Sequence, residues 1–261
     1  MKINSHKQAF GAVAKEYKKW RGGEDKRLYE LLVSLLGKKT DAAVLDVGCG
    51  VGNSTEPVLA FAKKHKISMT ITGSDIDDRM LVEARKSAKA NKLPIEYVEA
   101  PAEKLPFPKE SFDMAYSGAA FHWFATKKAL GSIKRVLKPG GTYAAFWVLF
   151  APSAKPPIGI EMYKKYKSQG IPQKLRNAEN VKKIFASAGF KKVTAVKIPF
   201  TETKTVEDII GNLKTNSTYA LLSPENRKDF VSGMRKAYKE ALKGKNTVTD
   251  KRELIIVHGT K

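Results

Sequence analysis

Three glycines at alternate positions carry the clearest chemical signal in this chain. Gly48, Gly50 and Gly52 follow an apolar run that ends at Val47, and a single carboxylate, Asp46, precedes them. Glycine adopts backbone angles that other residues avoid, and it lets a ligand approach the main chain closely. A strand that enters such a turn and continues as a helix is typical of a nucleotide site. We therefore expect a nucleotide-like cofactor to bind at this turn.

Two later segments add to the predicted site. Asp75 ends the next β-branched segment, at the distance from Gly50 where a carboxylate can accept hydrogen bonds from both ribose hydroxyls. Ala102 and Glu103 lie in a proline-bounded loop, where backbone contacts and apolar packing would hold an adenine ring. The spacing of the glycines differs from the G-x-G-x-x-G pattern of dinucleotide folds, so NAD is disfavoured.

A parallel sheet is needed to bring these segments together. Periodicity predicts strands at 43–47, 69–74, 95–99, 112–117, 142–149, 192–199 and 253–258. It predicts helices at 5–36 (interrupted at 22–23), 55–64, 77–90, 126–137, 177–188, 205–213 and 225–242. The alternation indicates an α/β fold, Rossmann-like and doubly wound, with a mostly parallel seven-stranded sheet and an antiparallel edge strand. The three segments above all follow strand carboxyl ends, where such sheets bind ligands.

The length of 261 residues fits a single domain. We expect an N-terminal helical cap at 1–36, a cofactor-binding core at 40–150, and a sheet completion at 151–261. Within the last part, a helical insertion at about 205–245 separates two strands and forms a second cap.

Net charge is the unusual feature of the composition. Lys and Arg total 48 against 26 Asp and Glu, a net charge of +22. Such a surface attracts nucleic acid or acidic metabolites. The basic residues are mostly lysines spread along the chain, which favours a general surface property over a nucleic-acid site.

Other compositional features exclude some classes of protein. The single cysteine rules out an internal disulfide, and four scattered histidines argue against a structural zinc site. No apolar run approaches the ~20 residues that cross a bilayer, and the N-terminus lacks a signal-peptide core. We therefore expect a cytoplasmic protein.

At this point the motifs resemble a known family. The runs LDVGCGVGN, AEKLPFP, FDMAYS and RVLKPGG, together with Asp75, are similar to those of class I S-adenosylmethionine-dependent methyltransferases, of the small-molecule type often called methyltransferase type 11. The resemblance covers residues 40–150 and implies S-adenosylmethionine as cofactor, with no metal. It places cofactor contacts at Tyr17, Arg21, Asp46, Gly48, Gly50, Gly52, Asp75, Ile76, Ala102, Glu103 and Ser117.

A finer resemblance concerns the methyl acceptor. The segments 119–124 and 209–219, with the N-terminal pattern Phe10…Tyr17…Arg21, are similar to trans-aconitate methyltransferases. This implies O-methylation of a carboxylate, with substrate contacts at His122, Trp123, Ser217 and Tyr219. A carboxylate is ionised at pH 7 and needs no general base. With a hydroxyl or amine acceptor, His122 would be the catalytic base.

Two alternatives stay open at the level of the sequence. One is a methyltransferase that acts on RNA or protein through the basic surface. The other is a non-catalytic protein that keeps the cofactor fold as a binding scaffold, although the intact glycines and Asp75 argue against it.

Overall fold

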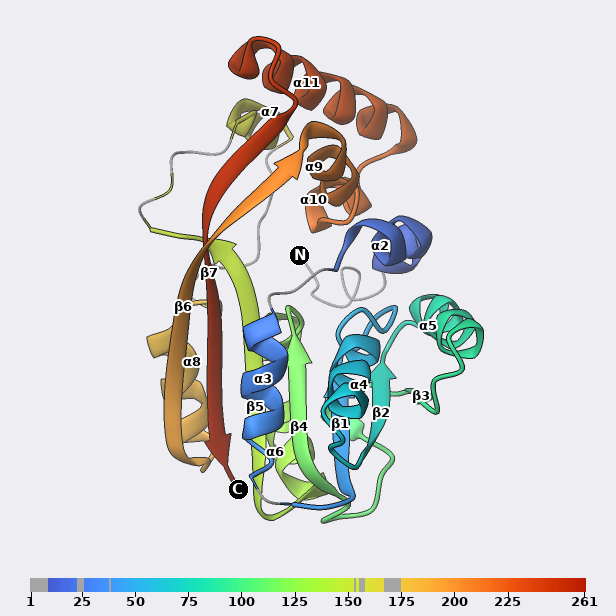
Figure 1. Ribbon diagram of the computed structural model, residues 1–261, viewed down its shortest axis with the longest axis vertical. Helices are drawn as coiled ribbons and strands as arrows, with labels where there is room; N and C mark the ends of the chain where they lie inside the picture. The colour runs from blue at the N-terminus through green and yellow to red at the C-terminus, as the bar shows by residue number, and fades with distance from the viewer. Residues whose placement is uncertain (1–8, 23–25, 38, 153, 155–157, 167–174) are drawn as a thin grey trace.

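The computed structural model contains one seven-stranded sheet with helices on both faces (Figure 1). It describes the chain except residues 1–8, 23–25, 38, 153, 155–157 and 167–174. The strands are β1 Ala42–Val47, β2 Met69–Asp75, β3 Glu96–Glu99, β4 Phe112–Gly118, β5 Leu137–Phe150, β6 Lys191–Thr205 and β7 Thr247–Thr260. The α-helices are α2 Ala14–Trp20, α3 Lys26–Ser34, α4 Thr55–Lys64, α5 Asp78–Ala90, α6 Lys127–Val136, α7 Ile160–Lys165, α8 Ala178–Ser187, α9 Val206–Leu213, α10 Ser217–Leu221 and α11 Pro224–Leu242. Three 3-10 turns, η1 Ala9–Val13, η2 Ala102–Lys104 and η3 Phe121–Trp123, lie near the carboxyl edge of the sheet.

The strand order is β3-β2-β1-β4-β5-β7-β6. Strands β1 to β5 are parallel, and β7 is antiparallel to both β5 and β6. The predicted Rossmann-like mixed sheet is therefore confirmed, with its antiparallel strand on the β6 side. The order reverses between β1 and β4, and such a switch point opens a crevice at the carboxyl ends of the strands.

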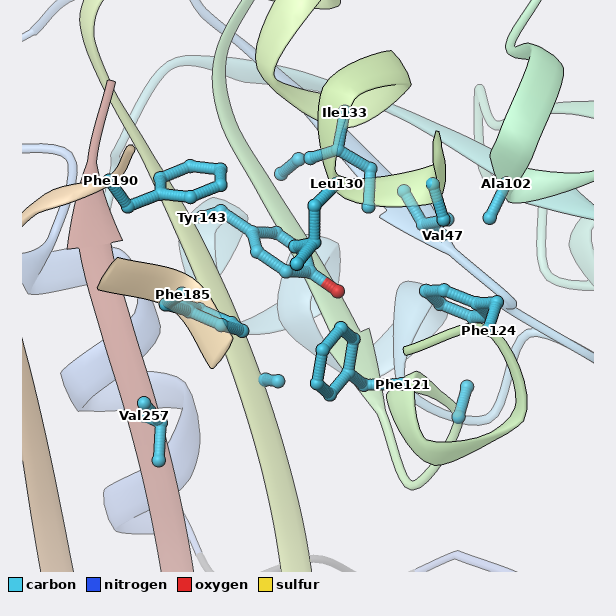
Figure 2. Packing of buried hydrophobic residues seen from close by; sticks show 14 of the residues in the cluster. Val47, Ala102, Phe121, Phe124, Leu130, Ile133, Tyr143, Phe185, Phe190 and Val257 are labelled. Carbon is cyan, nitrogen blue, oxygen red and sulfur yellow. The ribbon is translucent and has the colours of Figure 1, made fainter. Parts of the chain in front are cut away.

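Two apolar layers hold the helices on the sheet. Helices α6 and α8 pack on one face, and α3 and α4 pack on the other. Figure 2 shows the first layer, in which the ring of Tyr143 stacks on Phe185 with centroids 5.0 Å apart. Phe121, at the edge of this layer, packs edge-to-face on Phe185 and also contacts Trp147. The segment that carries His122 is therefore anchored in the core.

The last three strands are longer than the sequence predicted. The Lys138–Gly141 segment falls between the helix predicted to end at 137 and the strand predicted to begin at 142. It lies within β5 as an irregularity, with Gly140 at φ +72° and a register shift opposite Phe112 and Met114. Beyond the end of β5, strands β6 and β7 continue as a two-stranded arm, from the Thr201–Lys251 pair to the Thr205–Thr247 pair. This arm carries α9, α10 and α11 above the carboxyl edge of the sheet (Figure 1).

Side-chain caps fix the starts of several helices. Asp77 accepts a hydrogen bond from the Arg79 backbone N–H and begins α5, and Thr205 forms a capping box with Asp208 at the start of α9. The predicted first helix is divided into η1, α2 and α3, and its residues 5–8 and 23–25 lie outside the described part of the chain. In the described part, no helix has the length and apolar character to cross a bilayer.

Candidate active site

A cavity lies at the carboxyl edge of the sheet, beneath α2 and the helices of the arm. Its volume is about 1220 Å³ with its open mouth included. Two groups of residues line it. The glycine end consists of Gly48, Gly50, Asp75, Ile76, Ala102 and Glu103. The arginine end consists of Arg21, His122, Trp123, Trp147, Arg176 and Ser217.

The glycine turn has the conformation that its sequence predicts. Gly48, Gly50 and Gly52 have φ angles of +76°, +54° and +78°, which side chains with a Cβ rarely adopt. A Cβ at Gly48 would lie 2.7 Å from the Ala120 Cβ, and one at Gly52 would lie 2.3 Å from the Tyr97 hydroxyl. Gly48 and Gly50 line the cavity, whereas Gly52 shapes the turn from behind. The main chain is therefore bare where a ligand would approach it.

Asp75 is fixed by backbone donors on both sides. The Gly50 N–H donates to its Oδ2 at 2.9 Å, and the Asp77 N–H donates to its Oδ1 at 3.0 Å. Burial raises the pKa of Asp75, and these two hydrogen bonds oppose the rise. Each carboxylate oxygen keeps further lone pairs for a ligand in the cavity. The arrangement suits the predicted contact with ribose hydroxyls.

Asp46 lies beneath the turn and does not line the cavity. Its side chain is fully buried, and its Oδ2 accepts hydrogen bonds from the hydroxyls of Ser54 at 2.7 Å and Thr55 at 2.8 Å. Its Oδ1 has no partner. Burial raises the pKa of Asp46 to about 6, against the lowering effect of the two hydroxyls. This carboxylate holds the start of α4 beside the turn, and its predicted direct contact with a cofactor stays a prediction.

The remaining predicted residues of the glycine side divide into two sets. Ile76, Ala102 and Glu103 line the cavity, and the η2 turn places Ala102 and Glu103 directly after Pro101. Ser117 does not line it, because its hydroxyl is fully buried and bonded to the Tyr143 hydroxyl at 2.9 Å. The predicted role of Ser117 in closing the site remains untested.

The segment from η1 to Arg21 forms a roof over the cavity. Phe10 packs edge-to-face on Tyr17 and on Trp123, at centroid distances of 5.8 Å and 5.5 Å. Lys18 Nζ donates to the Val51 carbonyl at 3.1 Å and forms an ion pair with Glu56 at 2.8 Å. These contacts tie the roof to the glycine turn. Tyr17 lines the cavity, and its predicted contact with a cofactor stays a prediction.

Asn53 makes a second tie between the glycine turn and the roof. Its amide donates to the Tyr17 carbonyl at 3.0 Å and also to the Arg21 carbonyl. The backbone of Arg21 is therefore held directly above the loop that follows β1.

At the arginine end, Trp147 fixes the protonation of His122. The Trp147 indole N–H donates to His122 Nδ1 at 3.0 Å. An indole nitrogen can only donate, so Nδ1 is the unprotonated nitrogen and the neutral ring carries its proton on Nε2. Burial and, next, the charges of Arg176 and Arg21 lower the pKa of His122 to about 3. His122 is therefore a neutral hydrogen-bond donor at physiological pH and a poor base.

The predicted substrate contacts are only partly brought together. His122, Trp123 and Ser217 line the cavity. Tyr219 does not: it lies in a separate shallow surface groove, where the guanidinium of Arg227 stacks on its ring at 5.1 Å.

Trp147 and Arg176 line the cavity and were missed by the sequence analysis. Trp147 had one usable signal, a tryptophan near the carboxyl end of a predicted strand. Arg176 had none, because it lies between motifs, just before the Asn177 cap of α8.

Comparisons with known proteins agree with this geometry. Residues 45–145 match the methyltransferase domain family. The chain is 32% identical over 151 residues to demethylmenaquinone methyltransferase of Thermus thermophilus, which covers 58% of this chain and 66% of that protein. It is 32% identical over 137 residues to malonyl-[acyl-carrier protein] O-methyltransferase of Pseudescherichia vulneris, with coverage of 52% and 50%. The chain thus spans less than two thirds of the length of either relative.

A solved structure supports the fold over the whole chain. Phosphoethanolamine N-methyltransferase 2 of Haemonchus contortus, in complex with S-adenosylhomocysteine, aligns with a TM-score of 0.59 and 18% identity. The alignment covers 99% of this chain and 59% of that protein. The domain match and the two relatives, rather than this structure, bear out the family resemblance of residues 40–150. The resemblance to trans-aconitate methyltransferases stays a prediction.

Proposed function

We propose that this chain is a class I S-adenosylmethionine-dependent methyltransferase that transfers a methyl group to the carboxylate of a small-molecule acid. The methyltransferase domain match over residues 45–145 and the two relatives at 32% identity support this proposal. The glycine end fits the cofactor: Gly48 and Gly50 leave the main chain bare, Asp75 offers acceptors for ribose, and Ile76 offers an apolar surface for adenine. When bound, S-adenosylmethionine supplies a methyl group on a positively charged sulfur. The chain's own residues then have to bind and orient the acceptor and exclude water.

The observation that carries the carboxylate assignment is the Trp147–His122 hydrogen bond. It leaves His122 with an Nε2–H to donate and no free lone pair with which to remove a proton. A hydroxyl or ammonium acceptor has to lose a proton, whereas a carboxylate is ionised at pH 7. We therefore assign His122 the role of orienting an ionised acceptor and withdraw the role of base.

The carboxylates on the glycine side do not supply a base either. Both oxygens of Asp75 accept backbone hydrogen bonds, and Asp77 is paired with Arg79 at 2.8 Å. Both lie at the carboxyl end of β2, which is separated in the sheet from β5 and Trp147 by β1 and β4, and Glu103 follows β3, one strand further from β5. A pre-ionised acceptor suits this distribution of groups.

Two assays test the proposal. A thermal-shift assay should show stabilisation by S-adenosylmethionine and none by NAD. Transfer of labelled methyl should occur to members of a panel of di- and tricarboxylic acids, and not to the alcohols and amines of matched carbon skeleton. Between about pH 6 and pH 8.5, His122 stays neutral and a carboxylate acceptor stays ionised. We therefore expect the rate of methyl transfer to be constant over this range. Label found only in RNA or protein, with salt-sensitive RNA binding, would instead favour the alternative based on the +22 surface.

A further inference from the structure

Two arginines differ from the others in the described part of the chain. Arg135 donates to the carbonyls of Leu105 and Phe107, both at 2.7 Å, and Arg227 donates to those of Tyr219 and Ala220. The other arginines there have hydrogen-bond, ion-pair or other partners too, and the guanidinium of Arg21 lies 5.8 Å from the centroid of the Tyr17 ring. The side chains of Arg21 and Arg176 have neither a hydrogen-bond acceptor nor a carboxylate partner among the residues that the structure describes, and both line the cavity.

These two guanidinium groups act on one another and on the same neighbour. Burial, and next the charge of Arg21, lowers the pKa of Arg176. The charges of both arginines also contribute to the lowered pKa of His122. Arg21 reaches this place from the roof, where Asn53 holds its backbone, and Arg176 reaches it from the segment before α8. Two like charges therefore converge on the arginine end of the cavity from opposite sides.

Arg176 also has a buried donor with no acceptor: its Nε is buried and unpartnered. A buried charged donor without an acceptor is costly, so native proteins nearly always satisfy it. The described acids of the cavity, Asp75, Asp77 and Glu103, follow β2 and β3, across the sheet from α8. A ligand that brings oxygen atoms would satisfy this donor, and a guanidinium fork matches the oxygens of a carboxylate or phosphate.

We propose that Arg21 and Arg176 together bind an anionic group of the acceptor other than the carboxylate that is methylated. This differs from the cofactor contact that the family resemblance implies for Arg21. This inference rests on the proposed function. An oxygen that attacks a methyl group needs a free lone pair aimed at it, whereas two guanidinium groups bind the oxygens of the group they hold. The reacting carboxylate is left to the single N–H of His122. The acceptor is therefore an acid with two anionic groups, the second being a carboxylate or a phosphate.

Calorimetric titration can test this assignment without turnover. The wild-type protein and the variants Arg176→Gln and Arg21→Gln are first titrated with S-adenosylhomocysteine. The saturated proteins are then titrated with dicarboxylates from malonate to adipate, with trans-aconitate, with their monomethyl esters, and with analogues in which phosphate replaces one carboxylate. Arg235→Gln is the matched control, because it removes the same charge from an exposed arginine that pairs with Glu207.

We expect at least one diacid to bind the wild-type protein about tenfold more tightly than its monoester. Arg176→Gln should remove that preference while keeping the affinity for S-adenosylhomocysteine, and Arg235→Gln should change neither. Arg21→Gln should weaken the same preference. Tighter binding of the phosphate analogues would identify the second group as a phosphate, and tighter binding of the diacids would identify it as a carboxylate.

Three results would overturn the assignment. These are no preference for diacids in the wild-type protein, a preference that survives Arg176→Gln, or a loss of S-adenosylhomocysteine affinity in Arg176→Gln as large as its loss of diacid affinity. The last result would mean that the pair serves the carboxylate of the cofactor. Failure of the proposed function is recognised separately, by wild-type protein that binds S-adenosylhomocysteine and methylates no carboxylate at all.

Discussion

The two ends of the cavity are built in different ways. At the glycine end, Gly48, Gly50, Asp75 and Ala102 each lie at a strand's carboxyl end or within three residues of it, and backbone groups fix them, as in the Gly50 N–H to Asp75 bond of 2.9 Å. At the arginine end, the cavity is lined by side chains from five separated segments, and one side chain fixes another, as Trp147 fixes His122. A site made by strand–turn geometry suits a constant ligand. A site made by converging side chains can change one residue at a time, so it suits the ligand that differs between relatives.

The largest effect should come from Asp75→Ala. This substitution removes the acceptor for ribose hydroxyls and two backbone hydrogen bonds that hold the glycine turn. With hydrogen bonds to a charged group worth about 1.5–3 kcal/mol each, we expect S-adenosylhomocysteine to bind at least about 100-fold more weakly. Calorimetric titration measures this. Asp78→Ala, which removes an exposed carboxylate nearby, should leave the affinity unchanged. Equal affinities in the wild-type protein and Asp75→Ala would contradict the role of the glycine end.

A second prediction concerns Asp46, which supports the glycine end from below. Its folded-state pKa of about 6 lies above the ordinary value of 3.8, so the folded protein binds more protons than the unfolded chain between these values. The free energy of unfolding therefore falls as the pH rises through this window, by about 3 kcal/mol in all. Asp46→Asn removes the charge and keeps an oxygen for Ser54 and Thr55. We expect the free energy of unfolding of Asp46→Asn, relative to that of the wild-type protein, to rise by about 2 kcal/mol between pH 4.5 and pH 8.

Urea unfolding at the two pH values measures this, and Asp113→Asn is a control of opposite sign. Burial raises the pKa of Asp113, but Lys138 at 2.8 Å, the Ala43 N–H and Lys39 at 3.1 Å together hold it at about 2. A depressed pKa stabilises the folded state above the ordinary value, so Asp113→Asn should destabilise the protein at pH 8. A pH-independent effect of Asp46→Asn would argue against a raised pKa.

The difference between the two ends also explains what the sequence could predict. The cofactor segments were recognisable because each lies within a few residues of a strand end, so that one local pattern carries both position and chemistry. The sheet followed from the alternation of strands and helices for the same reason. Ser117 and Tyr219 do not line the cavity, and their predicted contacts stay predictions. A short segment does not reveal which of its side chains points into a cavity.

Other features depended on contacts that local patterns do not contain. Arg176 is brought to the cavity by the packing of α8 on the sheet, which no short stretch of sequence reveals. The extension of β6 and β7 into an arm depends on their pairing across more than forty intervening residues. Helix α10, with only five residues, is too short for periodicity to detect.

A third prediction tests the side-chain support at the arginine end. Trp147→Phe keeps an aromatic ring but removes the N–H that donates to His122 Nδ1. His122 is then free to adopt the other neutral tautomer, so its donor faces the acceptor for only part of the time. We expect the KM for the acid to rise about three- to tenfold, with the affinity for S-adenosylhomocysteine unchanged. Steady-state kinetics measure the first quantity and calorimetry the second. Tyr143→Phe, a similar loss in the same core without contact with His122, should leave both unchanged.

The smallest effect concerns Ala119, which lies where the two ends meet. It follows β4 in the left-handed region at φ +49°, its N–H donates to the Phe146 carbonyl at 2.9 Å, and it lines the cavity. A residue with a Cβ pays about 1 kcal/mol for this conformation, which glycine adopts freely. Ala119→Gly relieves that strain but makes the unfolded chain more flexible, so we expect a net change in the free energy of unfolding below about 1 kcal/mol. Urea unfolding measures it.

The informative result for Ala119→Gly is the kinetic one. If the strained backbone holds the segment that bears His122 in place, greater freedom at residue 119 should raise the KM for the acid about twofold and leave the affinity for S-adenosylhomocysteine unchanged. Gly131→Ala is a suitable reference for the glycine–alanine exchange, because a Cβ there meets no atom within 4 Å. A loss of cofactor affinity in Ala119→Gly, with an unchanged KM, would place this residue with the glycine end instead.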